Sequence, residues 1–160
     1  MIEGSLVEKA YGKINLGLKI LGRRPDGYHE ILSLAQCMDL ADTLHIESAS
    51  SDQLTCTIDQ LSTGPDNLVC RAVDAFRTRL DRPVQYFRIH LEKNIPMGAG
   101  LGGGSADAAA VLRALNRLYG APFANAELCE VGAGIQQPLQ DGRRRLGRRM
   151  AVEPIGIAAS

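Results

Sequence analysis

The sequence lacks long apolar runs, paired cysteines and an excess of either charge. No segment approaches the roughly 18 apolar residues that a membrane span needs, and residues 1–4 do not resemble the start of a signal peptide. We therefore expect a protein of the cytoplasm without a membrane partner. With 160 residues, 45% of them apolar, the chain can bury one core, or form one domain and part of a second.

The cysteines are scattered along the chain at Cys37, Cys56, Cys70 and Cys129, and no CxxC pair occurs. This spacing argues against a zinc knot and against a redox dithiol. We predict four buried free thiols, since free cysteine behaves as a small apolar residue.

The formal net charge is zero, but the charges are unevenly distributed. Residues 1–132 carry 13 basic and 16 acidic residues, whereas residues 133–160 carry five arginines, all between positions 143 and 149, and two acidic residues. A mildly acidic body argues against a nucleic-acid-binding surface over the whole domain, so no nucleic-acid partner is expected.

The most informative segment is rich in glycine and leads into an alanine-rich stretch that ends at Leu118. It reads Pro96, Met97, Gly98, Ala99, Gly100, Leu101, Gly102, Gly103, Gly104, Ser105, Ala106. Glycine permits positive φ and leaves no Cβ between the backbone amides and an anion, and the first turn of a helix presents unpaired N–H donors. The pattern predicts a phosphate-binding loop that opens a helix. Ser105 is the expected N-cap, with its hydroxyl directed at the first turn, at a phosphate or at its metal.

Three other interpretations of the glycine segment fit less well. Gly98, Gly100 and Gly103 match the dinucleotide fingerprint, but the segment follows several predicted strands and no acidic residue ends a strand at the required distance. A Walker loop requires a closing Lys-Ser or Lys-Thr pair, which is missing. A flexible linker is disfavoured because a strand precedes the segment and a helical pattern follows it.

Hydrophobic periodicity predicts the elements around the loop. Strands are expected at 10–20, at 86–93, and as a hairpin formed by 43–48 and 54–59; the apolar run 31–38 fits a strand or a short helix, and 22–27 forms a turn. Helices are expected from an Asn67 cap to about Leu80, and from the glycine loop to Gly120. The order indicates an α+β fold with a mixed sheet packed with helices.

Two motifs in this order resemble the GHMP kinases, the family of galactokinase, homoserine kinase and mevalonate kinase. The first is the glycine segment 96–106; the second combines Lys13-Ile14-Asn15-Leu16 with the residues 22–30, Gly-Arg-Arg-Pro-Asp-Gly-Tyr-His-Glu. The resemblance implies the N-terminal domain of that family, which is ribosomal protein S5 domain 2-like. The second motif is similar to the corresponding segment in one branch of the family. That branch uses ATP to phosphorylate the 2-hydroxyl of 4-diphosphocytidyl-2-C-methyl-D-erythritol, in non-mevalonate isoprenoid precursor biosynthesis.

The resemblance also implies a role for each motif. The glycine segment would hold the phosphates of ATP, with Mg²⁺ near Ser105, and Lys13 would lie near the acceptor hydroxyl as the catalytic cation. Asn15 would orient the substrate, while Tyr28 and His29 would bind its cytidine end. The residues alone leave open that Lys13 and Asn15 face solvent on a strand, and that Tyr28 and His29 only pack a turn.

The similarity covers residues 8–132, and we divide the chain there. Family members continue with a Gly-Ala-Asp-Val-Pro stretch whose aspartate is the catalytic base, and then with a C-terminal domain; we expect this chain to lack both, and Asp141 is not in that context. We interpret residues 133–160 as an aberrant tail, frameshifted in GC-rich alanine codons or disordered. A basic tail for RNA or anionic membranes and an inert arginine helix are the alternatives.

These expectations bear on activity. Without the base and the closing domain, we expect weak ATP binding, turnover near background, and self-association through exposed apolar surface. The alternative functions are another GHMP small-molecule kinase, of the homoserine or mevalonate type, and a non-catalytic nucleotide- or RNA-binding module.

Overall fold

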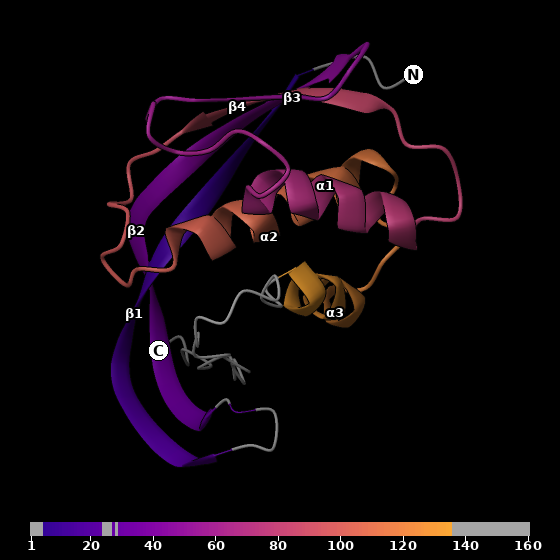
Figure 1. The fold of residues 1–160 in the computed structure, drawn as a ribbon. Helices are drawn as coiled ribbons and strands as arrows, with labels where there is room; N and C mark the ends of the chain where they lie inside the picture. Colours follow the sequence, from indigo (N-terminus) through magenta and orange to yellow (C-terminus); the bar gives the residue numbers. More distant parts are fainter. Residues whose placement is uncertain (1–4, 24–26, 28, 136–160) are drawn as a thin grey trace, which may run out of the picture.

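The computed structural model describes residues 5–23, 27 and 29–135, which form one mixed sheet with helices gathered on one side of it (Figure 1). The order of strands in the sheet is β1-β2-β4-β3. Helix α2 contacts β1 and β2, α1 packs on α2, and α3 contacts both helices. The elements are β1 (Ser5–Arg23), β2 (His29–Ala49), β3 (Gln53–Cys56), α1 (Leu68–Arg79), β4 (Tyr86–Glu92), α2 (Gly103–Leu118) and α3 (Asn125–Ile135). The predicted α+β class is confirmed.

A long antiparallel hairpin of β1 and β2 forms one edge of the sheet. The strand predicted at 10–20 extends over 19 residues, and the run 31–38 is a strand that continues without interruption through 43–48. Register shifts between Tyr11 and Lys13, between Asn15 and Gly17, and between Ile20 and Gly22 interrupt the pairing. Such bulges bend a strand and increase its twist, and the hairpin curves accordingly in Figure 1.

The hairpin predicted from 43–48 and 54–59 is wrong. β4 lies between these segments, antiparallel to β2 and parallel to β3. The short polar connection 48–52 resembles a hairpin turn, but the carboxylate of Asp52 accepts a hydrogen bond from Phe87 N at 2.9 Å and one from Arg77 Nη2 at 2.8 Å. Asp52 therefore ties the connection to β4 and α1, and β3 pairs with the far edge of β4.

The core lies between the sheet and the helices, as the periodicity predicts. It contains Leu44, Ile46, Ile89 and Leu91 from the sheet and Val69, Phe76, Val111 and Leu115 from α1 and α2, each at most 3% exposed. Asn67 caps α1 as expected, by accepting from Val69 N. Gly120, with φ of +79°, follows the C-cap of α2, which confirms its predicted place.

The prediction of four buried thiols is wrong in part. All four cysteines are free, but Cys37 and Cys129 are exposed, and Cys56 and Cys70 are half-buried. Cys37 belongs to the half of the hairpin where most side chains are exposed. Periodicity left a strand or a short helix open for the run 31–38 and did not show how far the helices cover it.

One half of the β1–β2 hairpin extends away from the helices (Figure 1). Its large apolar side chains are exposed to solvent. The large exposed apolar residues there are Ile14, Leu16, Leu18, Ile20, Leu21, Leu32 and Leu34. The register places Leu18 and Ile20 opposite Ser33 and Ile31, and Leu32 and Leu34 opposite Lys19 and Gly17, so both faces of the hairpin expose apolar side chains. Large exposed apolar patches mark interaction sites in soluble proteins.

Helix α3 extends to Ile135, which is 3% exposed, and so passes the division that we predicted at residue 132. The arginine run at 143–149 and Asp141 lie outside the described residues. No helix in the described ranges is long and apolar enough to cross a membrane.

Candidate functional site

The glycine loop connects β4 to α2 and has the backbone that its sequence predicts. Gly98, Gly100 and Gly102 adopt φ of +74°, +75° and +76°, a region that other L-residues rarely adopt. An added Cβ at Gly98 or Gly100 would meet no atom within 4 Å, so the loop surface is open there. The loop thus leaves its backbone accessible to an approaching ligand.

Helix α2 begins earlier than predicted, and Ser105 is not its N-cap. Gly102 occupies the cap in the left-handed conformation and makes no side-chain cap hydrogen bond; the first intrahelical bond runs from Ala106 N to Gly102 O at 2.9 Å. Ser105 lies in the first turn and is exposed. A Cβ at Gly103 would lie 3.1 Å from Ile95 Cγ2 and from Lys93 Nζ, so a larger residue there would require these side chains to shift by a few tenths of an ångström.

Lys13 of β1 lies against the glycine loop. Its Nζ donates a hydrogen bond to Gly100 O at 3.0 Å, and its backbone N–H donates to Leu101 O at 2.9 Å. The side chain also passes under the helix start, because a Cβ at Gly102 would lie 3.3 Å from Lys13 Cε. The structure therefore brings together the two sequence motifs at the positions of Lys13 and the loop.

Asn15 and His29 lie along the same hairpin. The pairing from Lys13 to Asn15 continues without a register shift, so the two share a face of the sheet, and Asn15 is exposed. His29 begins β2, opposite Arg23, and is half-buried. The β2 partner of Lys13 is Cys37, so His29 lies about 26 Å farther along the hairpin at 3.3 Å per residue. Tyr28 lies outside the described residues.

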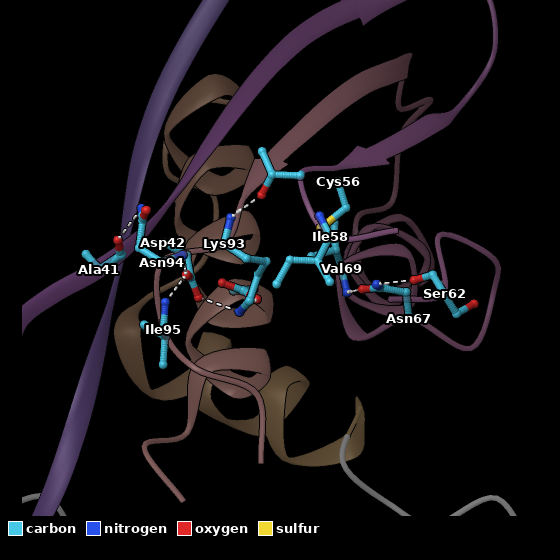
Figure 2. Close-up of polar contacts among 12 residues, drawn as sticks. Ala41, Asp42, Cys56, Ile58, Ser62, Asn67, Val69, Lys93, Asn94 and Ile95 are labelled. Atoms are coloured by element: carbon cyan, nitrogen blue, oxygen red, sulfur yellow. Dashed lines mark hydrogen bonds and ion pairs between the residues drawn. The ribbon is translucent and has the colours of Figure 1, made fainter. Parts of the chain in front are cut away.

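A buried ionic cluster behind the loop was not predicted. Lys93 Nζ lies 2.5 Å from Asp42 Oδ2 and 2.8 Å from Asp107 Oδ2, and the side chains are at most 4% exposed. Figure 2 shows Asp42 between Lys93 and the backbone of Asn94 and Ile95, whose N–H groups donate to Asp42 Oδ1 at 2.6 and 2.8 Å. The alternation along β4 could have indicated the burial of Lys93, because it places Lys93 on the same face as the core residues of that strand.

Burial opposes ionisation of both aspartates in this cluster, whereas their hydrogen bonds and the ammonium of Lys93 favour it. The balance differs between Asp42 and Asp107. Burial alone would raise the pKa of Asp42, but hydrogen bonds from Ile95 N, Lys93 and Asn94 N hold it below its usual value. Burial raises the pKa of Asp107 to about 7, although Lys93 opposes the shift. Asp107 Oδ1 is buried and makes no hydrogen bond to any described residue.

A pocket of about 300 Å³ adjoins the loop. Its walls are formed by residues 95–104, Lys93, Asp107 and the segment before α1, namely Leu61, Ser62 and residues 66–68. Asn67 fixes that segment: its Oδ1 accepts from Val69 N at 2.9 Å and its Nδ2 donates to Ser62 O at 2.6 Å (Figure 2). Sequence reasoning identified Asn67 only as a helix cap and missed its place beside the pocket.

The arrangement suits a phosphorylated ligand. The start of α2 carries N–H groups and the positive end of the helix dipole, and the ammonium of Lys13 lies beside them. The pocket next to the loop offers space for the part of the ligand that carries the phosphates. The described residues contain no group of three or more His, Cys, Asp or Glu that could hold a metal ion.

Comparison with known proteins identifies the family. Residues 67–144 match the GHMP kinases N terminal domain. A relative from Desulfitobacterium hafniense (strain Y51), named 4-diphosphocytidyl-2-C-methyl-D-erythritol kinase, is 44% identical over 146 residues, which cover 89% of this chain and 49% of the relative. Another with this name, from Salinibacter ruber (strain DSM 13855 / M31), is 45% identical over 81% of this chain and 45% of its own length.

Solved structures agree with the sequence relatives. A crystal structure of 4-(cytidine 5'-diphospho)-2C-methyl-D-erythritol kinase has a TM-score of 0.66 and 41% identity, covering 82% of this chain and 46% of that one. Mevalonate kinase from Methanococcus jannaschii, 18% identical with a TM-score of 0.62, shares the fold. The chain spans about half the length of the curated relatives it matches. Its sequence and its fold together show that the chain belongs to the GHMP kinase family and contains that family's N-terminal domain.

Proposed function

We propose that the whole protein transfers the γ-phosphoryl group of ATP to the 2-hydroxyl of 4-diphosphocytidyl-2-C-methyl-D-erythritol, in the cytoplasm, as a step of isoprenoid precursor synthesis. The observation that carries the proposal is the contact of Lys13 Nζ with Gly100 O, which puts a cation of β1 beside the open glycine loop. The relatives at 44% and 45% identity bear the name of this activity.

In this proposal the loop binds the phosphates of ATP, and ATP supplies the phosphoryl group. The N–H groups of the first turn of α2 hold the phosphate oxygens, since they precede the first intrahelical bond at Ala106. The ammonium of Lys13 neutralises charge on the transferred group and favours ionisation of the acceptor hydroxyl. Ser105, exposed in the first turn, is the proposed oxygen ligand for Mg²⁺.

In this proposal the substrate extends along the hairpin. The acceptor end lies at Lys13, and Asn15 orients the substrate from the next exposed position on the same face. His29 and Tyr28 are the proposed ligands of the cytidine end. A substrate with a diphosphate between its sugar and its base can extend along such a surface. We assign the general base, and the residues that complete the cytidine-binding site, to the half of the relatives that this chain does not match.

Calorimetric titration of the 160-residue chain tests the assignment of ligands. We expect binding of magnesium ADP and of the cytidine substrate, and weaker binding of homoserine and mevalonate. Preference for homoserine or mevalonate would assign the chain to another branch of the family. Salt-dependent RNA binding that disappears when residues 143–149 are deleted, without nucleotide binding, would favour the RNA-binding module.

A further inference from the structure

The glycine loop has two ends, and the same buried cluster contacts both. At its entry, Asp42 Oδ1 accepts hydrogen bonds from Asn94 N and Ile95 N at 2.6 and 2.8 Å. At its exit, Asp107 projects from the second turn of α2 to Lys93. Lys93 joins the two carboxylates, because its Nζ contacts Oδ2 of Asp42 at 2.5 Å and of Asp107 at 2.8 Å.

The cluster also lies close to the start of α2. Lys93 Nζ lies 3.1 Å from the position that a Cβ of Gly103 would occupy, and Gly103 is the first residue of α2. The ammonium therefore lies close to the turn that carries the N–H groups at the start of α2. Lys93 and Asp107 also line the adjoining pocket.

Stability alone is a poor reason for burying these charges. Removing ions from water is costly, and replacing a buried ion cluster by apolar or neutral groups of similar volume is often neutral or stabilising. Charged groups form directed contacts, which apolar groups do not. Such a contact fixes the separation of the two groups that it joins. Here those groups are the entry and the exit of the loop.

We propose that Lys93 is a positioning residue: by binding Asp42 and Asp107 together, it holds the two ends of the glycine loop at the separation that phosphate binding requires. The ligand part of this inference rests on the proposed function, whereas the effect on the loop does not. Removing only the ammonium would leave two carboxylates facing each other in the core, so Lys93→Met alone is expected to disturb the fold as well.

The test uses a triple variant, Lys93→Met with Asp42→Asn and Asp107→Asn, which removes all three charges at similar volume. Hydrogen exchange of the amides of residues 97–105 and calorimetric titration with magnesium ADP are measured on the 160-residue chain. We expect an unfolding midpoint in urea equal to or above that of the wild type, exchange at least about tenfold faster in the loop only, and nucleotide affinity at least about tenfold lower.

Arg113→Met is the matched control, since Arg113 of α2 forms its ion pair with Glu8, outside the cluster, with Nε and Oε1 3.1 Å apart. It should leave the loop amides unchanged. Unchanged loop exchange in the triple variant overturns the proposal, as does exchange that rises uniformly over the chain or a variant that does not fold. Wild-type chain that binds no ADP contradicts the proposed function, while loop exchange still decides the role of Lys93.

Discussion

Lys13 Nζ donates a hydrogen bond to Gly100 O across a sequence separation of 87 residues. The backbone N–H of Lys13 binds the next carbonyl of the loop, at Leu101, so the lysine is anchored to the loop at two points. Edge strand β1 and the β4–α2 connection thereby form one surface, on which a cation and the start of a helix lie side by side.

Replacing this lysine should affect chemistry more than folding. We predict that Lys13→Met lowers the turnover of the whole protein by about 10²- to 10³-fold, the range for loss of one charge-stabilising donor in a transition state. Steady-state phosphoryl transfer to the cytidine substrate measures the change. Lys19→Met, at an exposed position of the same strand, should leave turnover unchanged; equal effects of the two variants would place Lys13 on a merely solvated face.

The glycines of the loop differ in what an added methyl group would meet. Gly98→Ala and Gly102→Ala both force a non-glycine residue into positive φ, at about 1–2 kcal/mol of unfolding free energy each. Only the Cβ at position 102 would also press on Lys13 Cε, at 3.3 Å. We predict that the two variants lose similar amounts of unfolding free energy in urea denaturation, but that Gly102→Ala loses more affinity for ADP. Identical affinities of the two variants would show that Lys13 does not contribute to nucleotide binding.

Asn67 combines a helix cap with an anchor for the pocket wall. Asn67→Ala should lower the free energy of unfolding by about 1 kcal/mol, as expected for a lost N-cap. Asn67→Asp keeps the acceptor for Val69 N but loses the donor to Ser62 O. We expect this variant to retain most of the stability in urea denaturation yet bind ADP more weakly; unimpaired binding would show that Ser62 does not depend on this contact.

Asp52 predicts a dependence of stability on pH. Burial alone would raise its pKa, but the hydrogen bonds from Arg77 and Phe87 N hold the pKa below its usual value. A carboxyl whose pKa is lower in the folded state stabilises the fold above its unfolded pKa of about 3.9, and this contribution disappears as pH falls through the folded pKa. Asp52→Asn should therefore destabilise the protein near pH 7 and progressively less toward about pH 3.

Urea unfolding over this pH range measures the difference between Asp52→Asn and the wild type. Asp74→Asn is the control, because Asp74 also lies near Arg77, at 3.7 Å, but its side chain is 69% exposed. Its effect should be small at every pH. A constant difference between wild type and Asp52→Asn would contradict the assignment.

The exposed apolar half of the hairpin predicts self-association of the 160-residue chain. Leu32 and Leu34 are two residues apart on β2, share a face, and are 58% and 50% exposed. Leu32→Thr with Leu34→Thr should weaken association in sedimentation equilibrium while preserving the strand, since threonine suits strands. Val7→Thr, an exposed apolar position nearer the helices, should have no effect; association unchanged by the double substitution would exclude this surface.

Local patterns in the sequence determined most of the elements. The alternation that ends at Leu91 predicted β4, Asn67 predicted the start of α1, and Gly120 the end of α2. The glycines at 98, 100 and 102 predicted a loop with positive φ. These features depend on the conformational preferences of neighbouring residues, which the sequence contains directly.

The tertiary structure alone decided how the elements meet. It placed β4 between β2 and β3, moved the cap of α2 from Ser105 to Gly102, and buried Lys93 between two carboxylates. Each outcome depends on contacts between residues that are distant in the chain, such as Asp52 with Phe87 and Lys93 with Asp42. The free energy of such contacts depends on burial and on the geometry of the partner, and neither is encoded in a local pattern.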